Sequence, residues 1–302
     1  MQRVAGIDCG TNSIRLLVAD VEPDTGALTD LDRRMTIVRL GQGVDRTGRL
    51  APEALERTFA ACREYAQVIR ELGAQRLRFV ATSASRDAEN RDEFVAGVRG
   101  ILGVDPEVVT GDEEAELSFT GATKELAGRG GGPYLVFDLG GGSTEFVLGS
   151  DHVEAARSVD IGCVRLTERH GADWAAMRAD IEKALDLAAE TVPLTTGATL
   201  VGLAGTVTTV AAIALGLPEY DSQAIHRSRI PVAQVRAVAE RLMHATHEER
   251  AAIPVMHPGR VDVIGAGSLI LLSIMERTGA RELVVSEHDI LDGIAWSTLS
   301  RA

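Results

Sequence analysis

The chain contains one short pattern twice, and this repetition constrains its fold more than any other feature. "GIDCGTNSIRLLVAD" at 6–20 and "VFDLGGGSTEFVLG" at 136–149 each consist of an apolar run, Asp-x-Gly, small polar residues and a second apolar run. Three pairs of positions match at a spacing of 130 residues, namely Asp8 with Asp138, Gly10 with Gly140, and Ser13 with Ser143. Apolar runs joined by a glycine-containing turn are typical of β-hairpins. The repetition therefore predicts a duplicated domain rather than a short solenoid repeat.

Strand and helix patterns alternate around both hairpins, which predicts an α/β fold. In the first half we expect strands at 4–9, 14–20, 35–40 and 76–82, helices at 51–73 and 85–103, and a strand, loop and helix start over 106–117. In the second half we expect helices at 171–190 and 232–252 and a strand leading into a turn at 199–209. We also expect a turn that continues as a helix over 260–279, and a last strand and helix at 282–299. The glycine-rich segment 127–133 is the expected boundary, because few side chains there could hold a rigid interface. This gives domains at 1–126 and 133–288, with a closing helix at about 289–302 that packs back on the first domain.

Length and charge narrow the function classes. A chain of 302 residues exceeds one typical core, so two domains are expected. The formal net charge of −13 argues against binding to nucleic acid or to an anionic membrane, which requires a basic face. An anionic substrate would need a local arginine cluster or a bound cation, since Lys124 and Lys183 are the only lysines.

Three further features bear on location. The uncharged window 193–218 is long enough to cross a bilayer, but it is interrupted by glycine and rich in threonine, so we favour a buried strand, a turn and a helix. The scattered Cys9, Cys62 and Cys163 have no metal-ligand spacing and indicate free thiols in a reducing cytoplasm. The N-terminus enters a strand almost at once, so no signal peptide is expected.

The hairpins suggest a phosphate site. Small residues in a tight turn let backbone N–H groups point into one pocket that suits phosphate oxygens. An Asp beside such a turn would repel phosphate unless a divalent cation lies between them, and Mg²⁺ held by one or two carboxylates and phosphate oxygens is the usual solution. A single glycine-rich hairpin is more often only a turn. Two matching hairpins at equivalent positions instead favour a site in which a polyphosphate is bound from both sides.

The pattern resembles the actin, sugar kinase and heat-shock ATPase superfamily, and within it the exopolyphosphatase / guanosine pentaphosphate phosphohydrolase (Ppx/GppA) family. Seven segments carry the resemblance in the family's order, namely "GIDCGTNSIRLLVAD", "VATSASRDAEN", "TGDEEAEL", "VFDLGGGSTEFVLG", "GCVRLTE", "GLAGTVTT" and "PGRVDVIGAGSLIL". They cover nearly the whole chain. The resemblance implies two duplicated actin-like (ribonuclease H-like) domains with a cleft between them, and a homodimer.

The resemblance also implies roles for individual residues. Asp8, Asp138 and Glu145 match acidic residues at a catalytic Mg²⁺, or Mn²⁺ in its place. Glu114 matches the glutamate that orients or deprotonates the attacking water, and Arg86 matches a phosphate-binding arginine. The two phosphate loops correspond to Gly10, Thr11, Asn12 and Ser13, and to Gly140, Gly141, Gly142, Ser143 and Thr144.

The residues alone leave several alternatives open. Glu114 lies among Asp112, Glu113 and Glu116, and such a cluster is also typical of a solvated helix start. Arg165 and Arg260 could extend an anion path or serve as structural ion-pair partners, and the role of His257 is open. No histidine is placed in sequence to make Ser13 or Ser143 a nucleophile, and "HATHEER" lacks the glutamate placement of a zinc protease.

Three function classes remain. A phosphohydrolase acting on inorganic polyphosphate or guanosine pentaphosphate is favoured, because charge neutralisation, positioning and a water-directing carboxylate are what phosphoanhydride hydrolysis requires. A kinase of the same superfamily and a nucleotide-binding switch are the alternatives. Between the two substrates we favour polyphosphate, since it requires nothing beyond the phosphate grip. The sequence stops at Ala302, without the helical region of longer relatives, which suggests short chains.

Overall fold

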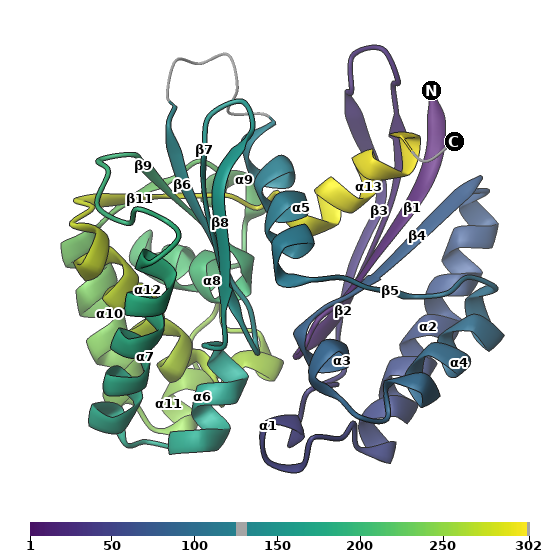
Figure 1. Cartoon of the computed structure of the whole chain (residues 1–302). Helices are drawn as coiled ribbons and strands as arrows, with labels where there is room; N and C mark the ends of the chain where they lie inside the picture. The colour runs from purple at the N-terminus through teal and green to yellow at the C-terminus, as the bar shows by residue number, and fades with distance from the viewer. Residues whose placement is uncertain (125–131, 301–302) are drawn as a thin grey trace. The chain divides into compact units, whose positions relative to one another are not determined.

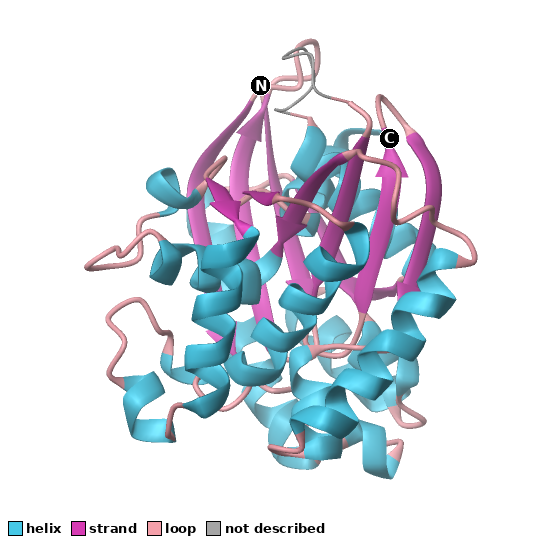
Figure 2. Cartoon of the chain, turned by 90° about the vertical axis from the view of Figure 1, so that its left-hand side faces the viewer, coloured by secondary structure: helices cyan, strands magenta, loops and turns pink. Residues whose placement is uncertain are grey.

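The computed structural model describes residues 1–124 and 132–300. The chain divides into two compact units, with unit 1 comprising 1–121 and 290–302 and unit 2 comprising 122–289. Each unit contains one mixed sheet with helices, so the predicted α/β class is confirmed (Figure 2). Most of the glycine-rich segment 127–133, the expected boundary, lies outside the described residues.

Unit 1 is built on a five-stranded sheet in the order β3-β2-β1-β4-β5 (Figure 1). Its strands are β1 (Gln2–Cys9), β2 (Ser13–Val21), β3 (Leu28–Ile37), β4 (Arg76–Ala81) and β5 (Glu107–Val108). β1 and β2 form the first predicted hairpin, and β4 runs parallel to β1. The third strand begins at Leu28, earlier than the expected 35–40, because it continues the hairpin and pairs with the full length of β2.

The helices of unit 1 are α1 (Val44–Thr47), α2 (Pro52–Leu72), α3 (Ser83–Asp87), α4 (Arg91–Leu102) and α5 (Gly111–Thr123). α2 matches the expected helix, starting with proline and ending at Gly73, whose φ of 70° suits glycine. The single helix expected at 85–103 is instead α3 and α4. The break is at Asn90, whose side chain exchanges two hydrogen bonds with the backbone of Leu50, at 2.8 and 3.1 Å.

Unit 2 is built on a six-stranded sheet in the order β10-β11-β9-β6-β7-β8 (Figure 1). Its strands are β6 (Tyr134–Leu139), β7 (Thr144–Gly149), β8 (Val153–Val159), β9 (Thr199–Leu203), β10 (Arg229–Pro231) and β11 (Glu282–Val285). β6 and β7 form the second predicted hairpin, and β9 runs parallel to β6. β8 and β10 were not expected from the sequence.

The helices of unit 2 are α6 (Cys163–His170), α7 (Trp174–Ala189), α8 (Ala204–Ala214), α9 (Ser222–Ile225), α10 (Val232–His244), α11 (His247–Ala251) and α12 (Ile264–Thr278), with a 3₁₀ turn at Pro258–Arg260. α12 contacts both α7 and α10 (Figure 1). The helix expected at 232–252 is divided, because Thr246 and Glu249 form a capping box that starts a new helix. In the described parts of the chain, no helix is long and apolar enough to cross a membrane.

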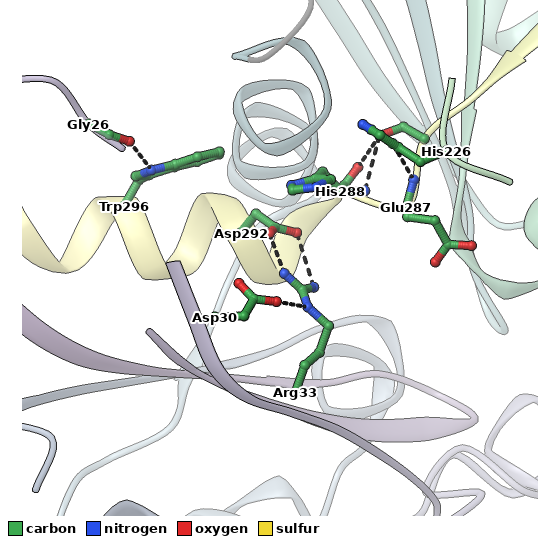
Figure 3. Close-up of polar contacts among 9 residues, drawn as sticks. Gly26, Asp30, Arg33, His226, Glu287, His288, Asp292 and Trp296 are labelled. Carbon is green, nitrogen blue, oxygen red and sulfur yellow. Dashed lines mark hydrogen bonds and ion pairs between the residues drawn. The ribbon is translucent and has the colours of Figure 1, made fainter. Parts of the chain in front are cut away.

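The closing helix α13 (Ile290–Ser300) packs on the sheet of unit 1. Leu291, Ala295 and Trp296 join apolar side chains of β1 and β2 in one cluster. Figure 3 shows two polar contacts that fasten this helix. The buried Asp292 accepts hydrogen bonds from Arg33 of β3, the shorter at 2.5 Å, and the Trp296 indole donates to the carbonyl of Gly26 at 2.9 Å.

Candidate functional site: two equivalent hairpin turns

The two hairpin turns have the same backbone arrangement. In unit 1 the N–H of Gly10 donates to the carbonyl of Ser13 at 3.0 Å, and in unit 2 the N–H of Gly140 donates to the carbonyl of Ser143, also at 3.0 Å. These are the residues related by the 130-residue repeat. The duplication seen in the sequence is therefore a duplication of turn geometry, with the acid-bearing strand directly before each turn.

In unit 1 the segment after β3 fixes which way the turn amides point. The carbonyl of Thr11 accepts a hydrogen bond from the N–H of Gly41 at 2.9 Å, and that of Asn12 accepts from Val38 and Arg39 at 3.1 and 2.8 Å. In a trans peptide the N–H of the next residue points opposite to the carbonyl. The N–H groups of Asn12 and Ser13 are consequently directed away from this segment, as an anion-binding turn requires.

In unit 2 the first turn of α6 has the same role. The carbonyl of Gly140 accepts from the N–H of Cys163 at 3.1 Å, and that of Gly141 accepts from Val164 and Arg165 at 2.9 and 3.0 Å. The Arg165 side chain donates from Nε to the carbonyl of Gly142 at 2.7 Å. Three consecutive carbonyls are thus turned toward α6. The N–H groups that follow them, those of Gly141, Gly142 and Ser143, point the other way.

One glycine in each unit makes this close approach possible. A Cβ at Gly41 would overlap the side chain of Thr11, and a Cβ at Gly162 would overlap the backbone of Gly141. Thr11 and Gly141 are themselves 130 positions apart. The sequence analysis did not assign either glycine, although Gly162 begins the motif "GCVRLTE".

Threonine hydroxyls also hold both turns. The Thr11 hydroxyl is hydrogen-bonded to the Ser83 hydroxyl at 2.8 Å, and Ser83 follows β4. The Thr144 hydroxyl donates to the carbonyl of Ile161 at 2.6 Å. Both threonines are at most 6% exposed, so their side chains contribute to the scaffold of the turns.

The two hairpins differ in charge at the position opposite the aspartate. In unit 1, Asp8 lies directly across from Arg15, which donates to Asp8 Oδ2 from Nε at 2.9 Å and from Nη2 at 2.7 Å. In unit 2, Asp138 lies directly across from Glu145. At the position directly across the strand, Asp8 therefore has an arginine, whereas Asp138 has a glutamate.

This second arrangement fits a divalent cation. Asp138 is 8% exposed and Glu145 is 1% exposed, and residues directly opposite on antiparallel strands point to the same face. Buried carboxylates in proteins are paired with positive charge or bind a metal ion, and a divalent cation can serve two of them at once. Carboxylate oxygens are also the ligands that Mg²⁺ prefers.

The side chains do not enclose a cation completely. In residues 1–124 and 132–300 no group of three or more His, Cys, Asp or Glu side chains is arranged to hold a metal ion. Mg²⁺ commonly takes one or two carboxylates and completes its shell with water and phosphate oxygens. The pair in unit 2 corresponds to this type of site rather than to a closed structural metal site.

Glu114 and Arg86 are brought together in unit 1. The Arg86 guanidinium donates from Nη1 to Glu114 Oε2 and to the carbonyl of Val109, both at 3.0 Å. Of the four clustered acids Glu114 is the buried one, at 8% exposed, while Asp112 and Glu116 are exposed and Glu113 pairs with Arg78 at 2.8 Å. A solvated helix start therefore describes Asp112 and Glu116, but it does not describe the buried Glu114.

The remaining candidates have structural contacts. The Arg165 side chain donates to the carbonyl of Gly142, as described above. This contact is a hydrogen bond to the backbone and not an ion pair, and it supports the turn. The Arg260 guanidinium lies against Gly205 at the start of α8 and donates to the Thr209 hydroxyl at 3.1 Å. His257 Nδ1 accepts from the N–H of Gly259 at 3.1 Å, and burial, with the nearby charge of Arg260, lowers its pKa.

The cysteines show no sign of reactivity. Cys9 follows Asp8 directly, and Cys163 begins α6 beside the second loop. Both are buried, and burial raises the pKa of each thiol above its ordinary value. A thiol with a raised pKa stays protonated and is a poor nucleophile and metal ligand.

Comparison with known proteins places these features in a family. Residues 17–302 match the model of the Ppx/GppA phosphatase family. The chain is 52% identical to "Exopolyphosphatase 2" of Mycobacterium tuberculosis, covering 98% of each sequence. It is 28% identical to the "Guanosine-5'-triphosphate,3'-diphosphate pyrophosphatase" of Aeromonas hydrophila, over 98% of this chain and 59% of that protein.

Solved structures agree. An exopolyphosphatase-like protein superposes with a TM-score of 0.94 at 43% identity, covering 98% of this chain and 97% of that one. The Aquifex aeolicus member of the Ppx/GppA family superposes with a TM-score of 0.82 at 31% identity, covering 99% and 98%.

Proposed function

Because the chain belongs to the Ppx/GppA phosphatase family, we propose that it is an exopolyphosphatase that releases orthophosphate from the end of inorganic polyphosphate. The reaction is attack of water on the terminal phosphorus, with cleavage of the bond to the bridging oxygen and departure of the shortened chain. The relative at 52% identity is named for this activity. We further propose that units 1 and 2 are the two duplicated actin-like domains.

Each loop has a part in this proposal. The N–H groups of Asn12 and Ser13 in unit 1, and those of Gly141, Gly142 and Ser143 in unit 2, bind phosphate oxygens. Their direction follows from the carbonyl contacts of the two turns. Such amides are fixed before substrate arrives, so they stabilise developing charge without reorganising.

Asp138 and Glu145 are the proposed ligands of a divalent cation, Mg²⁺ or Mn²⁺, and their opposed, buried carboxylates carry this assignment. The cation would neutralise phosphate charge in the transition state. Asp8 matches a further acid of the family's cation site, but its contact with Arg15 assigns it here to orienting this arginine toward phosphate.

The observation that carries the hydrolase proposal is the contact between the partly exposed Arg86 and the buried Glu114. A phosphate group that binds Arg86 competes for the guanidinium and leaves the Glu114 carboxylate to orient a water molecule. The carbonyl of Val109 keeps Arg86 in place during this exchange. A kinase must exclude water from the transferred phosphate, and a buried carboxylate paired with the phosphate-binding arginine does the reverse.

The test is phosphate release with Mg²⁺ from short polyphosphate, long polyphosphate, guanosine pentaphosphate and ATP. Glu114→Gln should lower kcat about 10²- to 10⁴-fold with little change in KM, the usual contribution of a general base. Glu116→Gln is the matched control, because Glu116 is an exposed acid on the same helix. Absence of release from every substrate by the folded wild-type protein would refute the hydrolase proposal.

Guanosine pentaphosphate is the second candidate substrate, favoured by the similarity to the Aeromonas hydrophila enzyme. Both substrates end in the same phosphoanhydride, so the same residues would act on either. Release from the nucleotide alone would assign the protein to that reaction. Cytoplasmic location is proposed from the three free cysteines. A homodimer is proposed from the family resemblance, and size-exclusion chromatography with light scattering measures the oligomeric state.

A further inference from the structure

A serine on the edge strand of unit 2 contacts one of the two proposed cation ligands. Ser158 of β8 lies directly across from Glu145 of β7, and its hydroxyl donates to Glu145 Oε1 at 2.7 Å. Glu145 in turn lies across from Asp138. The three side chains form one row over three neighbouring strands and lie on the same face of the sheet, because residues paired across strands share a face.

The equivalent row in unit 1 provides an internal comparison. There Asp8 lies across from Arg15, and Arg15 lies across from Met35 of β3. Ser158 thus belongs to the row of unit 2, which contains two carboxylates. Met35 takes the corresponding place in the row of unit 1, which contains one carboxylate.

We propose that Ser158 is a positioning residue that holds the Glu145 carboxylate in the orientation in which it binds the divalent cation together with Asp138. This proposal rests on the cation site of the proposed function. A glutamate side chain has three rotatable bonds, and its carboxylate can turn away from a neighbouring acid that repels it. A hydrogen bond to one oxygen limits that freedom, as partners of metal-binding carboxylates commonly do.

The direct test is Mn²⁺ binding to the whole protein, followed by electron paramagnetic resonance without substrate. Ser158→Ala should weaken Mn²⁺ binding about 10-fold, the effect typical of such second partners. Ser158→Thr keeps the hydroxyl and suits a strand, so it should stay within about 3-fold of wild type. Ser150→Ala is the matched control, since the Ser150 hydroxyl also contacts a glutamate, Glu154, at 3.4 Å in the exposed connection between β7 and β8.

A double-mutant cycle separates positioning from a general structural effect. If Ser158 acts through Glu145, Ser158→Ala should cause no further loss of Mn²⁺ affinity in a Glu145→Gln background. Thermal unfolding of each variant verifies folding, and Ser158→Cys, of similar size but a weaker donor, replaces the alanine variant if that one does not fold.

Three results would overturn the proposal: wild-type affinity in Ser158→Ala, an equal loss in the Glu145→Gln background, or no Mn²⁺ binding by wild type. Failure of the proposed function is a separate outcome. A wild-type protein that releases phosphate with Mg²⁺, together with unchanged Mn²⁺ binding in Ser158→Ala, would refute only the role of Ser158. Serine-dependent Mn²⁺ binding without phosphate release would refute only the hydrolase.

Discussion

The hairpins of units 1 and 2 share a turn and differ in charge. Both turns close with the same Gly-to-Ser hydrogen bond, and in both a following segment binds the turn carbonyls. Asp8 nevertheless faces an arginine, whereas Asp138 faces a glutamate. Duplication thus preserved the backbone of the turn, while the side chains diverged. The difference suggests that the second hairpin binds the cation and that the first binds phosphate without one.

The largest expected effect separates the two aspartates. Asp138→Asn removes one of two proposed cation ligands and should lower kcat for polyphosphate about 10³-fold, since cation stabilisation of the transition state amounts to several kcal/mol. Asp8→Asn leaves Arg15 in place and should lower kcat only about 10-fold, because it alters the orientation of a phosphate ligand. Steady-state kinetics at saturating Mg²⁺ measures both, and equal losses would break the comparison.

The second prediction concerns the glycines behind the turns. Gly41→Ala and Gly162→Ala each force a Cβ into the neighbouring turn, so both should destabilise the protein by about 1–3 kcal/mol and raise KM for polyphosphate. Gly100→Ala is the control, since nothing lies within 4 Å of its Cβ position in α4, and it should stabilise by up to about 1 kcal/mol. Denaturant unfolding measures all three. If Gly162→Ala changed neither the stability nor KM, the contact with α6 would not determine the conformation of the turn.

The smallest expected effect concerns the threonines of the turns. Thr144→Val leaves the carbonyl of Ile161 without this donor, and Thr11→Val removes the contact with Ser83, so each should cost about 1 kcal/mol of stability. Chemical denaturation with an unchanged m-value gives the difference. Wild-type stability in both variants would mean that the backbone contacts alone hold the turns.

Local patterns in the sequence predicted the parts of the fold that depend on local signals. Both hairpins follow from apolar runs joined by glycine-containing turns, and the end of α2 follows from Gly73. The break between α3 and α4 could not be predicted in this way, because it depends on Asn90 reaching Leu50, 40 residues earlier. The early start of β3 likewise depends on pairing with β2 rather than on its own composition.

Only part of the candidate site could be predicted from the sequence. The repeated motif identified the two loops, and the family resemblance supplied roles for Glu114 and Arg86, whose assignment stays a prediction. That Glu114 is buried while Asp112 and Glu116 are exposed depends on packing, which an acidic run does not reveal. The contacts of Gly41 and Gly162 with the turns required the structure, since each joins segments about 20 to 30 residues apart.

The most direct test of the difference between the hairpins is the Mg²⁺ dependence of polyphosphate hydrolysis in two variants of equivalent positions, Glu145→Gln and Arg15→Gln. If the second hairpin binds the cation, Glu145→Gln should raise the half-saturating Mg²⁺ concentration about 10-fold or more, while Arg15→Gln should raise KM for polyphosphate and leave the Mg²⁺ requirement unchanged. The same increase in the Mg²⁺ requirement in both variants would contradict the account, because it would mean that both hairpins contribute equally to the cation site.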